Sequence, residues 1–218
     1  LIEEAIDLLK QAKHPVILAG NDIIWCEATL ELKELADLLL IPVTTTWDHL
    51  DAFPTAYPLG LGPIGRNRSD AANHVLSKAD LLLALGAKFD YQSTRYNYEY
   101  IPKGSKIVQV TLDVEEVGCI YPVEIGIVSN VKFVLKEMVK RLRLDKGQIA
   151  NEWNIEKIRK IKEDWRQKRL SEIDLTAIPM MPQAIVKVLR EGLEPSAIIV
   201  VDGGNFAKHV RRHFDTYE

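Results

Sequence analysis

Short apolar runs alternate with segments of helical period along the first two thirds of the chain. Five runs are apolar or β-branched and are bounded by Gly, Pro or Asp, at 15–20, 41–46, 81–86, 106–110 and 123–128. The segments between them place apolar residues three and four positions apart, at 2–12, 27–40, 69–79 and 130–142. Near-continuous apolar runs are typical of strands covered on both faces, and their alternation with helices indicates a parallel sheet. We therefore expect an α/β fold, a doubly wound, Rossmann-like parallel sheet, over residues 1–145.

The pattern changes after residue 145. Residues 146–179 are rich in charge, and Trp153, Ile158 and Trp165 fall near a helical repeat. This predicts a helical linker that lays an apolar stripe on its neighbour. Residues 180–218 begin a second α/β unit, with a helix at 182–193 and a buried strand at 196–201. The second unit is incomplete, and the chain begins with Leu, so we expect a piece of a longer protein.

Composition narrows the function classes. Hydrophobic residues make up 47% and charged residues 27% of the chain, which excludes a disordered or collagen-like protein. Lys and Arg number 28 against 31 Asp and Glu, a net charge of −3, which gives no electrostatic reason to bind nucleic acid or an anionic membrane. Every apolar run is shorter than the ~18 residues of a membrane span. The charge balance leaves small molecules as the expected partners. The two cysteines lie far apart in the sequence, which suits a reducing compartment, so we expect a cytoplasmic protein.

Candidate binding residues follow the predicted strands. In a doubly wound sheet, ligands bind beyond the carboxyl ends of the strands. Gly20, Thr46, Lys88 and Asp113 each come directly after or close behind such a strand. Glycine lets a ligand approach the backbone, Thr and Asp offer hydrogen bonds, and Lys offers a charge. Together these positions favour a nucleotide-sized ligand.

Two further motifs have a less specific meaning. Residues 60–65 match G-x-G-x-x-G, but they follow a loop and contain Pro63, so we interpret them as a flexible glycine loop leading to a helix at Ser69. The amides of that helix, with Arg68 beside them, would suit an anion. His209 and His213 lie four residues apart without the accompanying carboxylate of a zinc motif. We expect them on a solvated helix face and assign no metal ligands.

Six segments in register resemble the middle domain of thiamine-diphosphate-dependent enzymes of the acetolactate synthase type. The counterparts of the family pattern are Ile41-Pro42-Val43 with Thr46, Phe53-Pro54 with Tyr57-Pro58, Gly62-Pro63-Ile64-Gly65, and the stretches 79–90, 102–118 and 125–132. From Met181 onward, Pro182-Gln183 and the run Asp202-Gly203-Gly204-Asn205 look like the opening of the family's diphosphate-binding domain.

The resemblance implies a parent enzyme that decarboxylates or ligates 2-oxo acids with thiamine diphosphate and Mg²⁺ and assembles as a homo-oligomer. Gly203, Gly204 and Asn205 would lie where the family's first loop approaches the cofactor diphosphate. In the family the activating glutamate belongs to an N-terminal domain, and the Gly-Asp-Gly metal motif belongs to the diphosphate-binding domain; neither is present in this chain. We therefore assign no catalytic residue to this chain and expect it to be inactive alone.

The family's middle domain holds FAD in acetolactate synthases, and ADP or nothing in some relatives. The matching positions are Gly20, Thr46, Gly62, Gly65, Lys88 and Asp113, with Lys88 in place of the family's Arg. Within the family, Gly-Pro-x-Gly and the run after Pro102 look closer to sulfoacetaldehyde acetyltransferase-like enzymes. The alternative outside the family is a free-standing FAD- or ADP-binding module.

Overall fold

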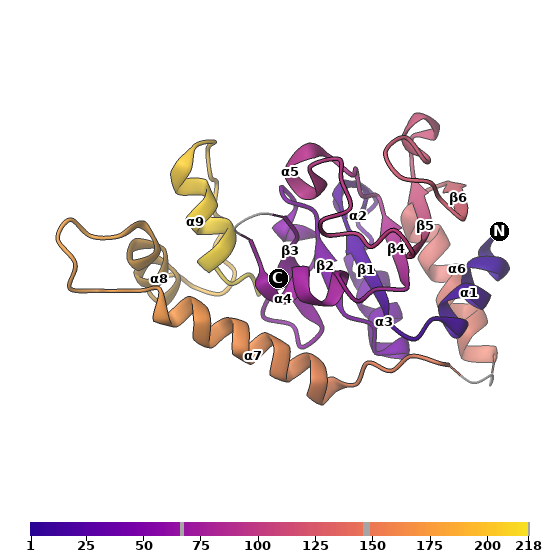
Figure 1. Cartoon of the computed structure of the whole chain (residues 1–218), viewed down its shortest axis with the longest axis horizontal. Coiled ribbons are helices and arrows are strands. Elements are labelled where there is room, and N and C mark those ends of the chain that lie inside the picture. The colour runs from indigo at the N-terminus through magenta and orange to yellow at the C-terminus, as the bar shows by residue number, and fades with distance from the viewer. Residues whose placement is uncertain (66–67, 146–148, 218) are drawn as a thin grey trace.

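The chain is built around one parallel sheet of six strands. The computed structural model describes residues 1–65, 68–145 and 149–217. The strands lie in the order β3-β2-β1-β4-β5-β6 (Figure 1). Their bounds are β1 Pro15–Ala19, β2 Val43–Thr45, β3 Gly60–Pro63, β4 Leu81–Leu85, β5 Lys106–Thr111 and β6 Ile125–Val128. All pairings are parallel, which confirms the predicted doubly wound α/β fold.

The strand sequences explain why the sheet is central. β1 and β4 are buried at every position and pair in register from Pro15 opposite Leu81 to Ala19 opposite Leu85. Apolar side chains on both faces require a layer on each side, because burial of apolar surface contributes about 25 cal/mol per Å². The chain order reverses between β1 and β4, so this pair is the topological switch point of the sheet.

Helices and 3₁₀ turns connect the strands. Their bounds are α1 Ile2–Gln11, α2 Asn21–Trp25, α3 Thr29–Leu39, η1 Leu50–Ala52, α4 Asp70–Leu76, α5 Tyr91–Thr94, η2 Val114–Glu116 and α6 Val131–Leu144. α6 packs against both α1 and α3, and α4 packs against β3. The four long helices predicted from apolar periodicity are confirmed in α1, α3, α4 and α6, with ends shifted by a few residues. Within the described residues, no helix combines the length and the apolarity that crossing a bilayer demands.

The glycine-rich segment after residue 59 corrects the sequence interpretation. We expected a flexible loop, whereas Gly60–Pro63 forms the edge strand β3 and pairs with β2. A β-carbon on Gly60 would lie 2.1 Å from the carbonyl oxygen of Pro54, so only glycine fits there. Pro63 is tolerated because an edge strand leaves one side of its backbone without a ladder partner.

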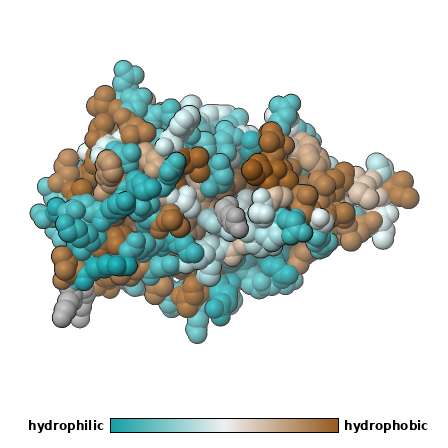
Figure 2. All heavy atoms as spheres, turned by 180° about the vertical axis from the view of Figure 1, so that it is seen from behind, coloured by the Kyte–Doolittle hydropathy of each residue, from teal (hydrophilic) through white to brown (hydrophobic). Residues whose placement is uncertain are grey.

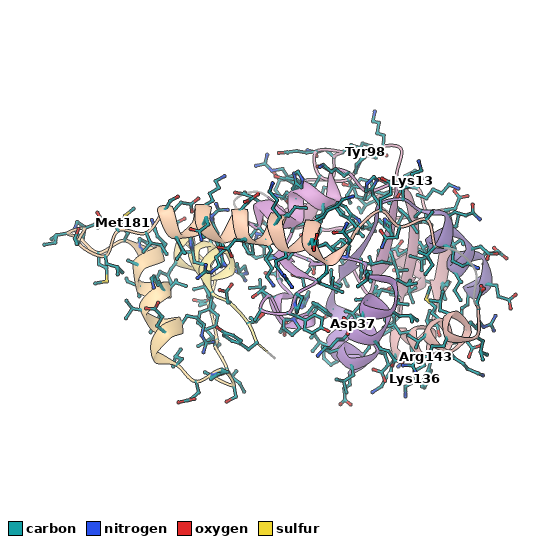
Figure 3. All side chains as sticks on the ribbon, turned by 90° about the horizontal axis from the view of Figure 1, so that it is seen from below. Lys13, Asp37, Tyr98, Lys136, Arg143 and Met181 are labelled. Carbon is teal, nitrogen blue, oxygen red and sulfur yellow. The ribbon has the colours of Figure 1, made fainter. Side chains whose placement is uncertain are left out.

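The remaining chain forms three helices beside the sheet. They are α7 Ile155–Ser171, α8 Pro182–Gly192 and α9 Asn205–His213. α7 runs along the molecule from the sheet to the end that carries α8 (Figures 1 and 3). Ile158 and Trp165 are buried in the main core, and the Trp153 indole donates to the Pro15 carbonyl at 3.0 Å. The predicted apolar stripe of the linker is therefore confirmed.

The predicted strand at 196–201 is wrong. This segment has no regular structure, and Ile198 and Val200 are 91% and 92% exposed. No strand among the described residues pairs with it, and an extended segment becomes a strand only when a neighbour satisfies its backbone. Figure 2 shows apolar side chains gathered at this end of the molecule. A small separate core of Val186, Val210 and Phe214 joins α8 to α9.

Candidate functional site

The carboxyl edge of the sheet collects most of the positions predicted to bind a nucleotide. Because all strands are parallel, Gly20, Thr46 and Gly65 follow β1, β2 and β3 on one edge, and Lys88 and Asp113 follow β4 and β5 there. Gly62 is the exception. It lies inside β3, where a β-carbon would stand 3.4 Å from the Trp165 ring.

At the switch point, the loops after β1 and β4 pack directly on each other. A β-carbon on Gly20 would lie 2.4 Å from the Gly86 carbonyl oxygen, and one on Gly86 would lie 2.2 Å from the Asp22 β-carbon. The buried Asp22 carboxylate accepts the amide N–H of Leu112 at 2.9 Å. These glycines therefore serve contact between two loops of the protein, which accounts for them without a ligand.

Both charged residues predicted at the edge already have partners within the protein. Lys88 Nζ lies 2.6 Å from Glu116 Oε1, and this contact raises the pKa of Lys88. The Asp113 carboxylate accepts the Glu115 amide at 2.9 Å and caps the turn η2. Lys88 and Asp113 thus both interact within the protein, without a ligand.

Thr46 and Gly65 complete the edge. The Thr46 hydroxyl is buried and has no hydrogen-bond partner among the described residues. Gly65 has φ of +109°, and a β-carbon there would lie 2.7 Å from the Gln92 carbonyl oxygen. Of the six predicted positions, Thr46 is the one with a buried side-chain polar atom that has no partner among the described residues. The edge thus fits the charged diphosphate of FAD or ADP poorly.

The loop before α9 contrasts with this edge. Gly203 and Gly204 have no atom within 4 Å of where a β-carbon would stand, and Gly204 has φ of +104°. Asn205 is the first residue of α9, a helix of nine residues. The free amides of a helix N-terminus behind open glycines suit a phosphate group. The residues at this loop therefore fit the diphosphate of thiamine diphosphate.

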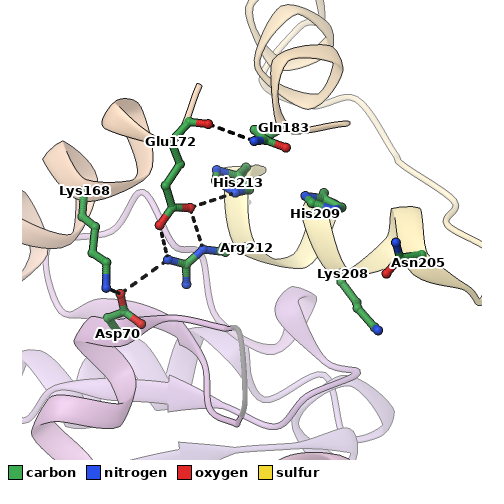
Figure 4. A pocket seen from close by; sticks show the side chains of 9 residues that line it. All are labelled: Asp70, Lys168, Glu172, Gln183, Asn205, Lys208, His209, Arg212 and His213. Atoms are coloured by element: carbon green, nitrogen blue, oxygen red, sulfur yellow. Dashed lines mark hydrogen bonds and ion pairs between the residues drawn. The ribbon is translucent and has the colours of Figure 1, made fainter. Parts of the chain in front are cut away.

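Beside this loop, residues of four helices line a polar hollow of about 420 Å³ that is open to solvent (Figure 4). It is lined by Asp70 of α4, Lys168 and Glu172 at the end of α7, Gln183 of α8, and Asn205, Lys208, His209, Arg212 and His213 of α9. The sequence interpretation names Asp70, Gln183, Asn205 and the two histidines among these residues, but it does not bring them together in one site. The grouping is missed because the residues come from four separate helices and belong to no local motif.

Arg212 connects the elements around the hollow. Its guanidinium lies 2.7 Å from Glu172 Oε1 and 3.4 Å from Asp70 Oδ2, and it donates to the Arg68 carbonyl at 2.5 Å. Lys168 lies 2.7 Å from the same Asp70 carboxylate. These contacts lower the pKa of Asp70 and Glu172, although burial opposes the shift at Asp70. Charge pairing thus joins α4, α7 and α9.

His213 corrects the predicted solvated face. Its residue is 8% exposed, and Nε2 lies 3.6 Å from Glu172 Oε2. Burial and the neighbouring Arg212 guanidinium lower the pKa of His213 to about 4. The His213 imidazole is therefore neutral at pH 7. His209, one turn earlier on α9, is partly exposed, so only one of the two histidines is buried.

A second contact between α9 and the sheet centres on Trp47. The guanidinium carbons of Arg68 and Arg211 lie 4.4 Å and 3.9 Å from its ring centroid. Arg211 also pairs with Asp48 at 3.0 Å. Burial and the nearby Arg211 lower the pKa of Arg68 to about 10. Cation–π contacts of this kind hold α9, and with it the loop at Gly203, against the central sheet.

The described residues form a doubly wound α/β sheet, and the long helix α7 leads from it to the small core shared by α8 and α9. A family model described as "Thiamine pyrophosphate enzyme, central domain" matches residues 2–138. The chain belongs to this thiamine pyrophosphate enzyme family, which confirms the resemblance drawn from its motifs.

Curated relatives cover nearly the whole chain. It is 37% identical over 222 residues to sulfoacetaldehyde acetyltransferase of Roseovarius nubinhibens, with 94% of this chain and 37% of that protein aligned. It is 33% identical to a probable acetolactate synthase large subunit of Methanocaldococcus jannaschii, over 99% of this chain and 36% of that protein. It is also 33% identical to the acetolactate synthase large subunit of Buchnera aphidicola, over 93% and 35%. The chain thus spans about a third of the length of these relatives.

Proposed function

We propose that this chain is the central part of a thiamine-diphosphate-dependent enzyme that decarboxylates or ligates 2-oxo acids. In this proposal residues 1–145 form the middle domain, residues 146–179 the linker, and residues 180–218 the start of the diphosphate-binding domain. The observation that carries it is the open loop of Gly203 and Gly204 at the start of α9. Membership of the family supports it.

In the parent enzyme, Gly203, Gly204 and Asn205 hold the diphosphate through backbone amides and the Asn amide. Open space at both glycines lets phosphate oxygens reach the backbone without a side chain in the way. When bound, thiamine diphosphate supplies the nucleophile for attack on the 2-oxo group. The central sheet contributes by positioning α9 through Trp47 and Arg212, and Mg²⁺ is held by a motif of the diphosphate-binding domain that is not among these 218 residues.

Two substrate assignments compete within the family. Relatives named sulfoacetaldehyde acetyltransferase and relatives named acetolactate synthase large subunit both align over most of the chain. We propose an acetolactate synthase-like carboligase, with a sulfoacetaldehyde acetyltransferase-like enzyme as the alternative. Incubating the parent enzyme with a 2-oxo acid alone, or together with sulfoacetaldehyde and phosphate, separates the two by their products.

A nucleotide in the middle domain, either FAD or ADP, is a second prediction. The buried Thr46 hydroxyl without a partner in the described chain favours it. The pairing of Lys88 with Glu116 and the contact of Gly20 with Gly86 count against it. Titration of the chain with FAD and with ADP tests this prediction, and saturable binding would also support the alternative of a free-standing nucleotide module.

The main proposal is tested with the full reading frame that contains this chain. The purified parent protein, supplied with thiamine diphosphate and Mg²⁺, should release CO₂ from a 2-oxo acid. The 218-residue chain under the same conditions should release none. Absence of release by the parent with every 2-oxo acid tested would contradict the proposal. Light scattering of the same sample tests the expected homo-oligomer, and cell fractionation tests the expected cytoplasmic location.

A further inference from the structure

The chain that leaves α9 is held on the central sheet region by a pair of threonines. Thr55 lies in the loop between η1 and β3, and Thr216 follows the end of α9. The Thr55 amide donates to the Thr216 hydroxyl at 2.9 Å, and the Thr216 amide donates to the Thr55 hydroxyl at 2.8 Å. The Ala56 amide also donates to the Thr216 carbonyl at 2.9 Å. Two segments 161 residues apart thus hold each other through reciprocal hydrogen bonds.

The surroundings of Thr55 make this contact depend on hydroxyl side chains. Thr55 is 3% exposed, and a β-carbon on Gly62 would stand 3.5 Å from its methyl carbon. A buried loop amide needs an acceptor, and here each threonine hydroxyl accepts the amide of the other. Valine at either position has the same shape but leaves one amide without its acceptor, which costs more than the hydrogen bond itself contributes.

Thr216 is close enough to α9 in the chain to act on the helix. Only two residues separate it from the end of α9 at His213. The Asp215 carboxylate between them pairs with Arg169 of α7 at 2.9 Å, so this short connection has little freedom. Figure 1 shows the C-terminal end of the chain beside β3 and α4. A helix of nine residues is a stiff rod about 14 Å long, so a shift at Thr216 is passed to the loop at Gly203.

We propose that Thr55 and Thr216 are positioning residues for the diphosphate site. Their hydrogen bonds fix the C-terminal end of α9 and, through the helix, the orientation of the amides at its N-terminal end. This role rests on the proposed function, since the loop at Gly203 must hold the diphosphate for its orientation to matter. It adds to the contacts of Arg212 and Trp47, because those act on side chains of α9, whereas the threonine pair holds the backbone that follows the helix.

The first test measures the affinity of the complete parent enzyme for thiamine diphosphate in the presence of Mg²⁺. Thr216→Val removes the hydroxyl and keeps the shape, so affinity should fall about tenfold. Thr216→Ser keeps the hydroxyl and should stay within about twofold of the parent. Thr111→Val is the matched control, because it removes a buried hydroxyl of β5 that bonds to Glu116 and to the Asp113 amide, at the opposite side of the sheet from β3. It should leave the affinity unchanged.

The second test needs no cofactor and follows amide hydrogen exchange in the parent protein. In Thr216→Val the peptides that cover α9 should exchange about threefold faster or more, while those that cover β4 should keep their rate. Thr111→Val should not change the exchange of α9. Faster exchange in β4 as well as in α9 would indicate a global loss of stability and would contradict a positioning role.

A double variant tests whether the two threonines act as one unit. Thr55→Val should weaken cofactor binding about as much as Thr216→Val, because each removes one hydroxyl of the pair. Together they should weaken it by less than the product of the two single effects, since either change already disrupts the shared contact. Independent effects would contradict the proposal, and so would equal weakening by Thr216→Val and Thr216→Ser.

The results distinguish this role from the proposed function itself. If the unsubstituted parent binds no thiamine diphosphate, the proposed function fails and the role of the threonine pair fails with it. If the parent binds the cofactor and Thr216→Val binds it equally well, only the role of the threonine pair is overturned.

Discussion

Gly20 at the end of β1 and Gly203 before α9 lie in equivalent places, each between an apolar run and a helix, yet their surroundings differ completely. A β-carbon on Gly20 would lie 2.4 Å from a backbone oxygen, whereas one on Gly203 would have nothing within 4 Å. The loops at the strand ends of the central sheet pack on each other, whereas the space around the glycines before α9 is open. A glycine between an apolar run and a helix therefore indicates that other atoms can approach the backbone closely. Only the structure shows whether those atoms belong to the protein or are left to a ligand.

The two regions are joined by α7, so the largest effect should come from its buried anchor. Trp165 is 4% exposed, while Trp25 is 75% exposed. Trp165→Ala should lower the free energy of unfolding by about 3–5 kcal/mol, since it removes a large buried ring. Trp25→Ala is the matched control and should change it by less than about 1 kcal/mol. Urea denaturation measures both, and a small loss for Trp165→Ala would mean that the linker helix does not anchor the two regions.

Next in size is the contrast between the two glycine loops, at Gly20 and at Gly203. Gly20→Ala places a methyl group against the Gly86 backbone and should cost about 3 kcal/mol of stability. Gly203→Ala meets open space and should stay within about 0.5 kcal/mol of the parent chain. Thermal unfolding of the two variants compares them directly. Equal stability would remove the distinction between a closed loop and an open one.

The charge cluster at the hollow should have a smaller effect. Arg212→Met leaves the carboxylates of Glu172 and Asp70 without their shared guanidinium and should cost about 2 kcal/mol. Arg166→Met removes an exposed i,i+3 partner of Glu163 on the same helix, α7, and should cost less than about 0.5 kcal/mol. If denaturation gives the same small loss for both variants, the cluster does not hold α9 to α4 and α7.

The pH dependence of stability should report His213. Its pKa of about 4 in the fold lies below the ordinary 6.5, so the folded state binds fewer protons than the unfolded chain between these values. Stability therefore falls as pH drops from about 6.5 toward 4, by about 1–2 kcal/mol between pH 7 and pH 5. The charged neighbours of His213 are Arg212, Glu172, Arg169 and His209.

The comparison variant for this pH effect is His213→Leu. Its melting temperature should change less than that of the parent chain over the same interval, because the titrating imidazole is gone. Asp70 and Glu172 also lose their stabilising contribution in acid, but only as pH falls through pKa values that lie below the ordinary carboxyl range. An unchanged slope in His213→Leu would contradict the buried neutral imidazole.

The smallest effect is expected at Lys162. Its ammonium donates to the Tyr57 carbonyl at 2.5 Å, and burial lowers its pKa to about 8. Lys162→Met removes a partly buried charge together with one hydrogen bond, so stability should change by no more than about 0.5 kcal/mol. Thermal unfolding checks this expectation. A large loss of stability would mean that the contact of Lys162 with the Tyr57 carbonyl stabilises the central sheet region.

The sequence pattern predicts correctly those helices and strands whose structure is determined by buried apolar side chains. The runs at β1 and β4 are strands because Val, Ile and Leu fill both faces. β3 was missed because its glycines pair through backbone atoms alone and leave no apolar signature. The segment at 196–201 has the right composition for a strand but no neighbour in the described chain, and strand formation depends on that neighbour.

The candidate sites were predictable to a lesser degree. The sequence pattern places Gly203, Gly204 and Asn205 in a loop after a predicted strand, and only the family resemblance connects them with a diphosphate. It grouped Gly20, Thr46, Lys88 and Asp113 at one edge correctly, but it had no way to show that Asp22 and Glu116 already occupy the polar groups around them. The hollow at Gln183 and His213 depends on helix packing across four elements, which a local motif does not encode.

The most direct test of the central claim is the affinity of the parent enzyme for thiamine diphosphate. Gly203→Val fills the open loop at the proposed diphosphate site, and Gly104→Val adds the same side chain at another glycine with open surroundings. Equilibrium titration in the presence of Mg²⁺ should show affinity about tenfold lower or weaker for Gly203→Val and unchanged for Gly104→Val. Equal affinity of the two variants would contradict a role for this loop in holding the cofactor.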